Sequence, residues 1–111
     1  MEFTRSHKVS RLIQKDLSEI FLNESKIHFK GLLITVTHVF ISKDFSVAKV
    51  YLSLFPTKKK ESFLKKINQR KKNIKIILAQ KTRRQLRKMP ELFFHIDNSL
   101  DHYEEVDSLL K

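Results

Sequence analysis

Apolar residues recur at helical spacing near the start of the chain. Within residues 4–22 they return every third or fourth position, which places them on one face of an α-helix. This apolar face comprises Val9, Leu12, Ile13, Leu17, Ile20 and Phe21. Basic side chains lie on or beside the opposite face. The pattern predicts an amphipathic first helix with a basic outer surface.

Two segments of alternating polarity follow the single glycine, Gly31. Residues 32–41 and 46–55 both alternate, and the polar residues 42–45 between them form a connection of hairpin length. The side chains expected to face inward are Ile34, Val36, Phe40, Ala48, Val50, Leu52 and Leu54. Those expected on the other face include Thr35, Thr37, Lys49, Tyr51 and Ser53. The pattern predicts an antiparallel hairpin.

A second helical pattern runs through residues 58–88, with Thr57 as the expected N-cap. Its recurring apolar residues are Phe63, Leu64, Ile67, Ile74, Ile77 and Leu78. One helix of this length would extend about 46 Å at 1.5 Å per residue, whereas a compact chain of this size has a diameter near 34 Å. We therefore expect two helices with a kink at Lys71-Lys72-Asn73, where charge interrupts the apolar stripe.

A third strand is expected after Pro90, where Leu92, Phe94 and Ile96 alternate with more exposed positions. Residues 98–111 form a short acidic segment in which residues 104–110 could add one helical turn. The predicted order is α-β-β-α-α-β, in a single α+β domain of residues 1–97 followed by the acidic segment.

Composition limits the functional classes. The chain has no cysteine, and its longest apolar run of about ten residues is half of what a membrane span needs. Residues 1–10 are polar and show no signal-peptide core. The five histidines lack metal-ligand spacing, and no nucleophile–base pair or phosphate loop is present. We expect a soluble cytoplasmic protein that is not an enzyme, with no cofactor, metal or small-molecule substrate.

Charge points to a polyanionic partner. Residues 58–88 contain fourteen Lys or Arg and one acidic residue, a net charge of +13 against +11 for the whole chain. Lysine and arginine bind RNA phosphates by displacing counterions. The expected contacts are Lys71, Lys72, Lys75, Lys81, Arg83, Arg84, Arg87 and Lys88, with Arg5, Lys8 and Arg11 as a second patch. The alternative is an ordinary solvated basic face.

Outward aromatic residues allow two interpretations. Tyr51 and Phe93 are expected on the outer face of the sheet, where they could stack on unpaired bases. The simpler interpretation is cross-strand packing.

Several short motifs resemble the ribosome-binding factor A family, bacterial assembly factors of the small ribosomal subunit. The motifs are Thr35-Val-Thr-His-Val39, Ser42-Lys-Asp-Phe45, Ala48-Lys-Val-Tyr-Leu-Ser53, Leu86-Arg-Lys-Met-Pro-Glu-Leu92 and Phe94-His-Ile-Asp97. The resemblance implies a type II KH-like domain with helices on one face of a three-stranded sheet and no Gly-x-x-Gly loop. It also implies that the RNA backbone runs along the helix–helix junction, near Asn73. The family usually has Ala, often followed by Gly, at that junction, where this chain has Arg70-Lys-Lys-Asn-Ile74.

The resemblance implies binding to the small (30S) ribosomal subunit or its precursor rRNA, and promotion of late maturation of the rRNA 5′ region. Two alternatives stay open at this point. One is a structural or hibernation-type protein bound to the ribosome, and the other is a nonspecific binder of nucleic acid or anionic membrane. A membrane role is disfavoured because the apolar helix stripe is needed to cover the sheet. Nothing in the sequence demands an oligomer, so a monomer is expected.

Overall fold

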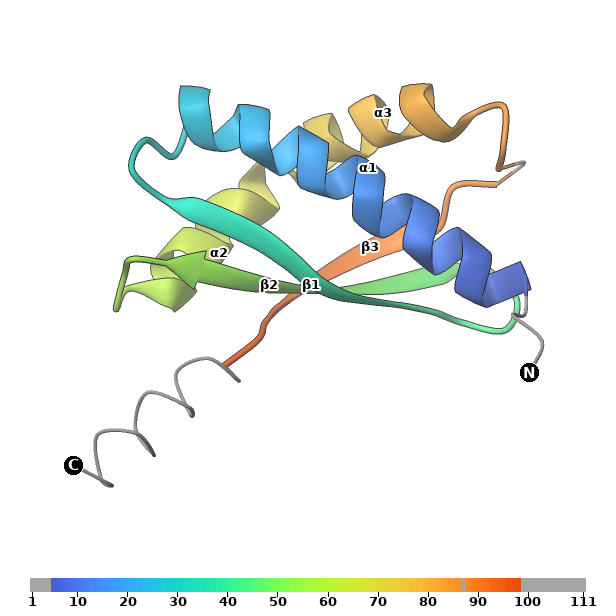
Figure 1. Ribbon diagram of the computed structural model, residues 1–111, viewed down its shortest axis with the longest axis horizontal. Helices are drawn as coiled ribbons and strands as arrows, with labels where there is room; N and C mark the ends of the chain where they lie inside the picture. The colour runs from blue at the N-terminus through green and yellow to red at the C-terminus, as the bar shows by residue number, and fades with distance from the viewer. Residues whose placement is uncertain (1–4, 87, 99–111) are drawn as a thin grey trace.

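The computed structural model describes residues 5–86 and 88–98. Its elements follow the predicted order (Figure 1). They are α1 (Arg5–Ile27), β1 (Leu33–Ile41), β2 (Val47–Phe55), α2 (Lys60–Gln69), α3 (Lys71–Thr82) and β3 (Glu91–Ile96). The sheet order is β1-β2-β3, with β1 and β2 antiparallel and β2 and β3 parallel. Helices α2 and α3 form the crossover that a parallel pair requires.

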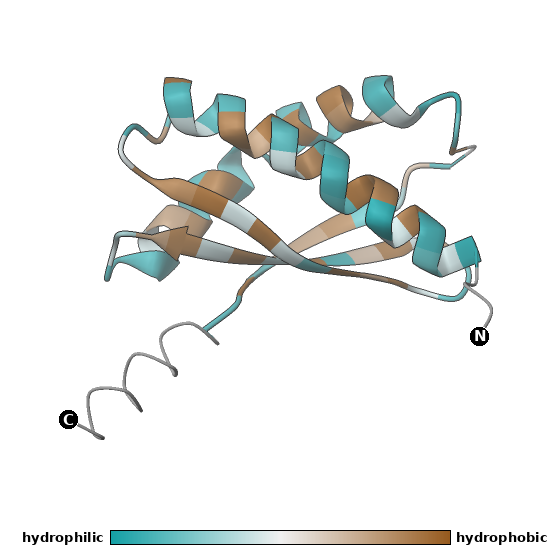
Figure 2. Cartoon of the chain, viewed as in Figure 1, coloured by the Kyte–Doolittle hydropathy of each residue, from teal (hydrophilic) through white to brown (hydrophobic). Residues whose placement is uncertain are grey.

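The helices lie on one side of the sheet, as predicted. Helix α1 packs over β1 and against α3, while α2 contacts β3 (Figure 1). Hydrophobic and hydrophilic residues alternate along α1 (Figure 2), because only one stripe of the helix faces the sheet. Within this core the Phe21 ring meets the Phe94 ring edge-on, with centroids 5.7 Å apart. The core links α1 with α3 and all three strands. Besides Phe21, the core side chains with no more than 2% exposure include Ile13, Leu17, Ile20, Leu52, Ile74, Leu78 and Leu92.

The first strand departs from simple alternation. Its pairing with β2 shifts between Val36 and His38, so that Thr37 is an extra residue of a β-bulge. Beyond the bulge Val39 faces the core, whereas Phe40 is 58% exposed on the opposite face. The prediction that Phe40 faces inward was therefore wrong, because one inserted residue reverses the orientation of everything after it.

The basic segment forms two helices, but the break precedes the predicted position. Helix α2 ends at Gln69 and α3 begins at Lys71, with Arg70 between them. Asn73 is the third residue of α3 and is exposed. The N-cap of α2 is Lys59 and not Thr57, whose hydroxyl accepts a hydrogen bond from the Lys59 N–H at 3.0 Å. The break lies at a residue tied to a distant helix, as described below.

Two further differences concern the ends of elements. Helix α1 continues to Ile27, five residues beyond the predicted end. Gly31 then reverses the chain with a φ of 83°, a conformation that glycine adopts without strain. The predicted turn at residues 104–110 lies outside the described residues.

Candidate nucleic-acid interface

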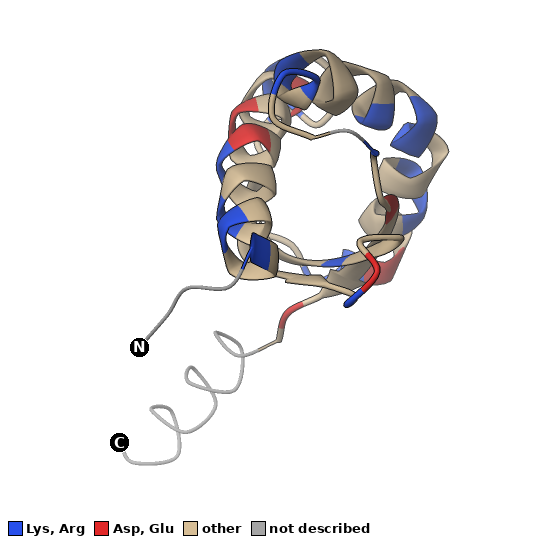
Figure 3. Cartoon of the chain, turned by 90° about the vertical axis from the view of Figure 1, so that its right-hand side faces the viewer, with Lys and Arg blue, Asp and Glu red and all other residues tan. Residues whose placement is uncertain are grey.

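The predicted basic residues gather on α3 and on the turn that follows it. Figure 3 shows lysine and arginine distributed over the helical side of the molecule. Those with exposed side chains are Lys72, Lys81, Arg83, Arg84 and Lys88. Lys71 and Lys75 are half-buried beside β3, and Arg87 lies outside the described residues.

Three of the predicted lysines form ion pairs. Lys75 Nζ donates to Glu91 Oε2 at 2.8 Å, and Lys71 Nζ lies 3.5 Å from Glu91 Oε1. On the other side of α3, Lys81 Nζ donates to Glu19 Oε2 of α1 at 3.0 Å. The hydrogen bonds from Lys75 and Lys81 hold the pKa of the Glu91 and Glu19 carboxyls below the usual range. A phosphate that bound these lysines would have to compete with a carboxylate already present.

The turn after α3 offers cations without such competition. Arg83 and Arg84 follow Thr82, whose buried hydroxyl donates to the Leu78 carbonyl at 2.9 Å at the end of the helix. Within the described part of the chain, neither arginine nor the exposed Lys72 has an acidic partner. These three side chains are therefore the best placed to bind phosphate through their full charge.

The second basic patch lies toward the same end of the molecule. In Figure 1 the start of α1 and the turn after α3 both lie toward the right-hand end of the molecule, so Arg5, Lys8 and Arg11 lie toward the end that carries Arg83 and Arg84. The last turn of α3 itself meets α1 at Glu19, well past the start of α1. All three α1 side chains are exposed. The Arg5 guanidinium also lies 5.8 Å from the centroid of the Phe45 ring. One extended phosphate backbone could thus meet both patches.

Helix α2 and the residues just before it add basic side chains that the predicted contacts omitted. They are the exposed lysines Lys58, Lys59, Lys65 and Lys66. Lys66 Nζ also lies 5.3 Å from the centroid of the Phe63 ring. The sequence signal for them was the charge run itself, which includes them but does not tell which of its residues share a surface.

Arg70 is held by a buried carboxylate. Its Nε donates to Glu24 Oε2, and its Nη2 donates to Glu24 Oε1 at 3.2 Å. Glu24 is 6% exposed in the last turns of α1. This two-point hydrogen bond raises the pKa of the Arg70 guanidinium further. The charge at the α2–α3 junction is therefore satisfied within the protein.

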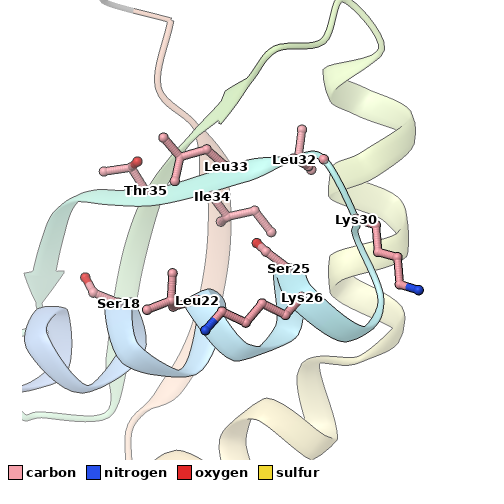
Figure 4. A pocket seen from close by; sticks show the side chains of 10 residues that line it. Ser18, Leu22, Ser25, Lys26, Lys30, Leu32, Leu33, Ile34 and Thr35 are labelled. Atoms are coloured by element: carbon pink, nitrogen blue, oxygen red, sulfur yellow. The ribbon is translucent and has the colours of Figure 1, made fainter.

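A groove lies at the opposite end of α1, against the start of β1 (Figure 4). Its volume is about 520 Å³. Its apolar walls include Leu22 and Leu33, which are 53% and 56% exposed, and Lys26 and Lys30 line it as well. Its polar groups are lysines, hydroxyls and backbone, which supply no acid–base pair for catalysis.

The described residues contain neither a metal site nor a membrane-spanning helix. Within 5–86 and 88–98, no three His, Asp or Glu side chains converge as metal ligands. No helix in the same ranges is long and apolar enough to cross a bilayer. His38 and His95 flank Tyr51 across the sheet, and do not form a pair of their own.

The comparisons with known proteins agree with the fold. A family model described as ribosome-binding factor A matches residues 5–110. The ribosome-binding factor A of Christiangramia forsetii is 42% identical over 111 residues, which is 99% of this chain and 85% of the relative.

Two structures from Thermus thermophilus are similar. The crystal structure of its ribosome-binding factor A is 26% identical and covers 84% of this chain and 97% of that chain, with a TM-score of 0.67. A homology model of the same factor, fitted into a cryo-electron microscopy map of its complex with the 30S subunit, is 25% identical, with a TM-score of 0.66, covering 86% of this chain and 97% of that chain. The resemblance noted in the sequence is confirmed over nearly the whole chain. The chain belongs to the ribosome-binding factor A family.

Proposed function

We propose that this protein binds the small (30S) ribosomal subunit or its precursor rRNA and promotes late maturation of the rRNA 5′ region. The observation that carries the proposal is the pair Arg83 and Arg84 after α3, which have no acidic partner among the described residues, on a fold shared with a Thermus thermophilus factor that was fitted into a 30S complex. The protein acts in the cytoplasm as a monomer, without catalysis or a cofactor.

The mechanism is stabilisation of one rRNA conformation. A binding protein shifts a conformational equilibrium only by the difference in its affinity for the two states. The protein therefore binds the immature particle more tightly than the mature one and leaves when the preferred conformation is lost. Lys72, Arg83 and Arg84 supply the phosphate contacts, and Arg5, Lys8 and Arg11 extend the contact along α1. Asn73, exposed one position after Lys72, adds an uncharged hydrogen-bonding group to this surface.

The test is cosedimentation with immature 30S particles, mature 30S particles, large subunits and bulk RNA over a salt series. We expect binding to immature 30S particles to persist near physiological salt. The Arg83→Gln/Arg84→Gln variant should lose most of this binding. The matched control is Lys26→Gln/Lys30→Gln, which removes the same charge beside the groove at the other end of α1 and should bind as the unmodified protein does.

Other outcomes identify other functions. Equal binding to every polyanion, lost together as salt rises, indicates a nonspecific basic domain. Equal, salt-resistant binding to mature and immature 30S particles indicates a ribosome-bound structural or hibernation-type protein. Either result contradicts a role in maturation.

A further inference from the structure

The face of the sheet opposite the helices carries an ordered set of aromatic side chains. Strand register places His38, Tyr51 and His95 in one row across the three strands, and Phe40, Lys49 and Phe93 in the next. We refer to these six residues as the aromatic grid. No helix of residues 5–86 and 88–98 covers them (Figures 1 and 3).

The rings of the grid hold one another in place. Tyr51 stacks on His95 with centroids 5.2 Å apart and planes 29° apart, and Phe40 meets Tyr51 edge-on at 5.8 Å. His38 stacks on Phe40 at 6.0 Å. The cross-strand packing expected for Tyr51 is thus present. It also fixes the Phe40 ring, which stays 58% exposed. Phe93, two strands away in the same row, is 44% exposed.

The β-bulge gives two of the six grid residues, His38 and Phe40, their outward orientation. Without the register shift at Thr37, the alternation of β1 would continue unchanged, and both His38 and Phe40 would face the core. The irregular backbone is stabilised from two sides. Gln14 Nε2 donates to the Val36 and Thr37 carbonyls at 3.1 and 3.3 Å, and the Thr37 hydroxyl donates to Asp97 Oδ2 at 2.7 Å. Bulges commonly re-aim side chains at functional sites, and this one turns a large aromatic residue toward solvent.

The charges around the grid favour a negatively charged occupant. Lys49 stands between Phe40 and Phe93 and has no acidic partner among the described residues. Lys71 Nζ lies 4.6 Å from the centroid of the Phe93 ring. The two nearby carboxylates are engaged, Glu91 by Lys71 and Lys75 and Asp97 by Thr37. Open ring faces beside the available cation of Lys49 suit a ligand that has both flat bases and phosphates.

We propose that the aromatic grid is a stacking platform for unpaired bases of RNA. This proposal deepens the proposed function, because it adds a base-stacking surface to the phosphate contacts of α1 and α3. Phe40 and Phe93 are the residues on which bases stack, and Lys49 binds the adjoining phosphate. Tyr51, stacked on His95, holds the Phe40 ring through an edge-on contact.

The test compares two oligomers that differ only in their bases. One is an oligouridylate of about ten nucleotides, close to the site sizes of known stacking surfaces, and the other is an abasic ribose-phosphate of equal length. We expect the protein to bind the oligouridylate at least about tenfold more tightly, given what stacking contributes per base. Phe40→Leu/Phe93→Leu should abolish this ratio and leave binding to the abasic oligomer unchanged.

Two controls separate stacking from folding and from general hydrophobicity. Phe55→Leu removes an equally exposed phenyl ring from the same sheet face outside the grid and should keep the ratio. Lys49→Gln should weaken the binding of both oligomers to the same extent, because it removes a phosphate contact. Thermal unfolding followed by circular dichroism shows that each variant is folded.

The outcomes are distinct. The platform is overturned if the unmodified protein binds the oligouridylate and the abasic oligomer equally well. It is also overturned if the preference for the oligouridylate persists in Phe40→Leu/Phe93→Leu. If Phe40→Leu/Phe93→Leu no longer cosediments with 30S particles, and neither it nor the unmodified protein prefers the oligouridylate, the face contacts a protein and not RNA. If the same variant keeps salt-resistant 30S binding, and the unmodified protein shows no preference for the oligouridylate, the platform is refuted and the proposed function stays intact.

Discussion

At the scale of single residues, the pair between Glu24 and Arg70 decides where the basic segment bends. The carboxylate is buried at the end of α1, and the guanidinium is the residue between α2 and α3. Replacing Glu24 by Gln would leave a half-buried cation with one weaker acceptor. We expect Glu24→Gln to lower the free energy of unfolding by about 2 kcal/mol, measured by urea denaturation.

The control for this prediction is Glu19→Gln. Glu19 also pairs with a cation, Lys81, across the α1–α3 contact, but both side chains of this pair are exposed to solvent. Exposed ion pairs contribute little, so this variant should be close to the unmodified protein in stability. Equal losses for the two variants would show that burial at the junction is not what makes the Glu24 pair important.

Asp44 sets a pH dependence in the hairpin turn. Hydrogen bonds from the Ser46 and Ser42 hydroxyls and from the Ser46 N–H lower the pKa of the Asp44 carboxyl from 3.8 to about 2. A depressed pKa in the folded state means stability that is present above pH 3.8 and is lost as the pH falls toward 2. Asp44→Asn should therefore be less stable than the unmodified protein at neutral pH.

The difference between the two proteins should shrink as the solution is acidified through that range. Urea denaturation at several pH values measures it, with Lys43→Gln as the control in the same turn. A gap that stays constant down to the pKa of about 2 would mean that the charge of Asp44 does not strengthen these hydrogen bonds.

At the scale of elements, the β1 bulge depends on a few specific hydrogen bonds. The Thr37 hydroxyl lies 2.7 Å from Asp97 Oδ2 and 3.2 Å from the Tyr51 carbonyl oxygen. Thr37→Val keeps the shape and removes the donor. We expect a loss of about 1 kcal/mol in the free energy of unfolding, together with altered chemical shifts for the Phe40 ring.

Thr35→Val is the matched control, because Thr35 is an exposed threonine two residues earlier on the same strand. It should leave stability unchanged or slightly raised, since valine suits a strand. If Thr37→Val were equally neutral, the bulge would be held by Gln14 and by the strand pairing alone.

The elements themselves could be predicted because each depends on local pattern. Apolar spacing in α1 and alternation in β2 report which side of the element is buried, and neither needs knowledge of the rest of the chain. The bulge could not be predicted in this way. Its stabilising contacts come from Gln14, 22 residues away, and from Asp97, 60 residues away. The same holds for the break at Arg70, whose carboxylate partner is 46 residues away.

At the scale of the whole molecule, charge was predictable in amount but not in availability. The sequence shows a strongly basic segment, yet Lys75 and Lys81 pair with carboxylates 16 and 62 residues away. Only the folded structure separates these lysines from Arg83 and Arg84. Total charge governs attraction at long range, whereas bound phosphates require side chains that are free to contact them.

Two variants with equal change in net charge distinguish these contributions. Arg83→Gln/Arg84→Gln removes two cations that have no acidic partner in the described part of the chain, and Lys71→Gln/Lys75→Gln removes two that share Glu91. We expect the arginine variant to reduce the slope of log affinity against log salt by about 1.4 for single-stranded RNA, from roughly 0.7 per phosphate contact. The lysine variant should reduce it by clearly less, because few counterions are displaced where a carboxylate already lies.

Titrations of both variants with the abasic oligomer, from low salt to physiological salt, give the two slopes without any contribution from base stacking. If the slopes fall equally, the RNA responds to net charge alone, and the distinction between paired and unpaired cations has no bearing on binding. If the lysine variant falls more, the RNA displaces Glu91 and binds along the β3 side of α3. The expected order, with the arginines dominant, would place the phosphate path at the end of α3.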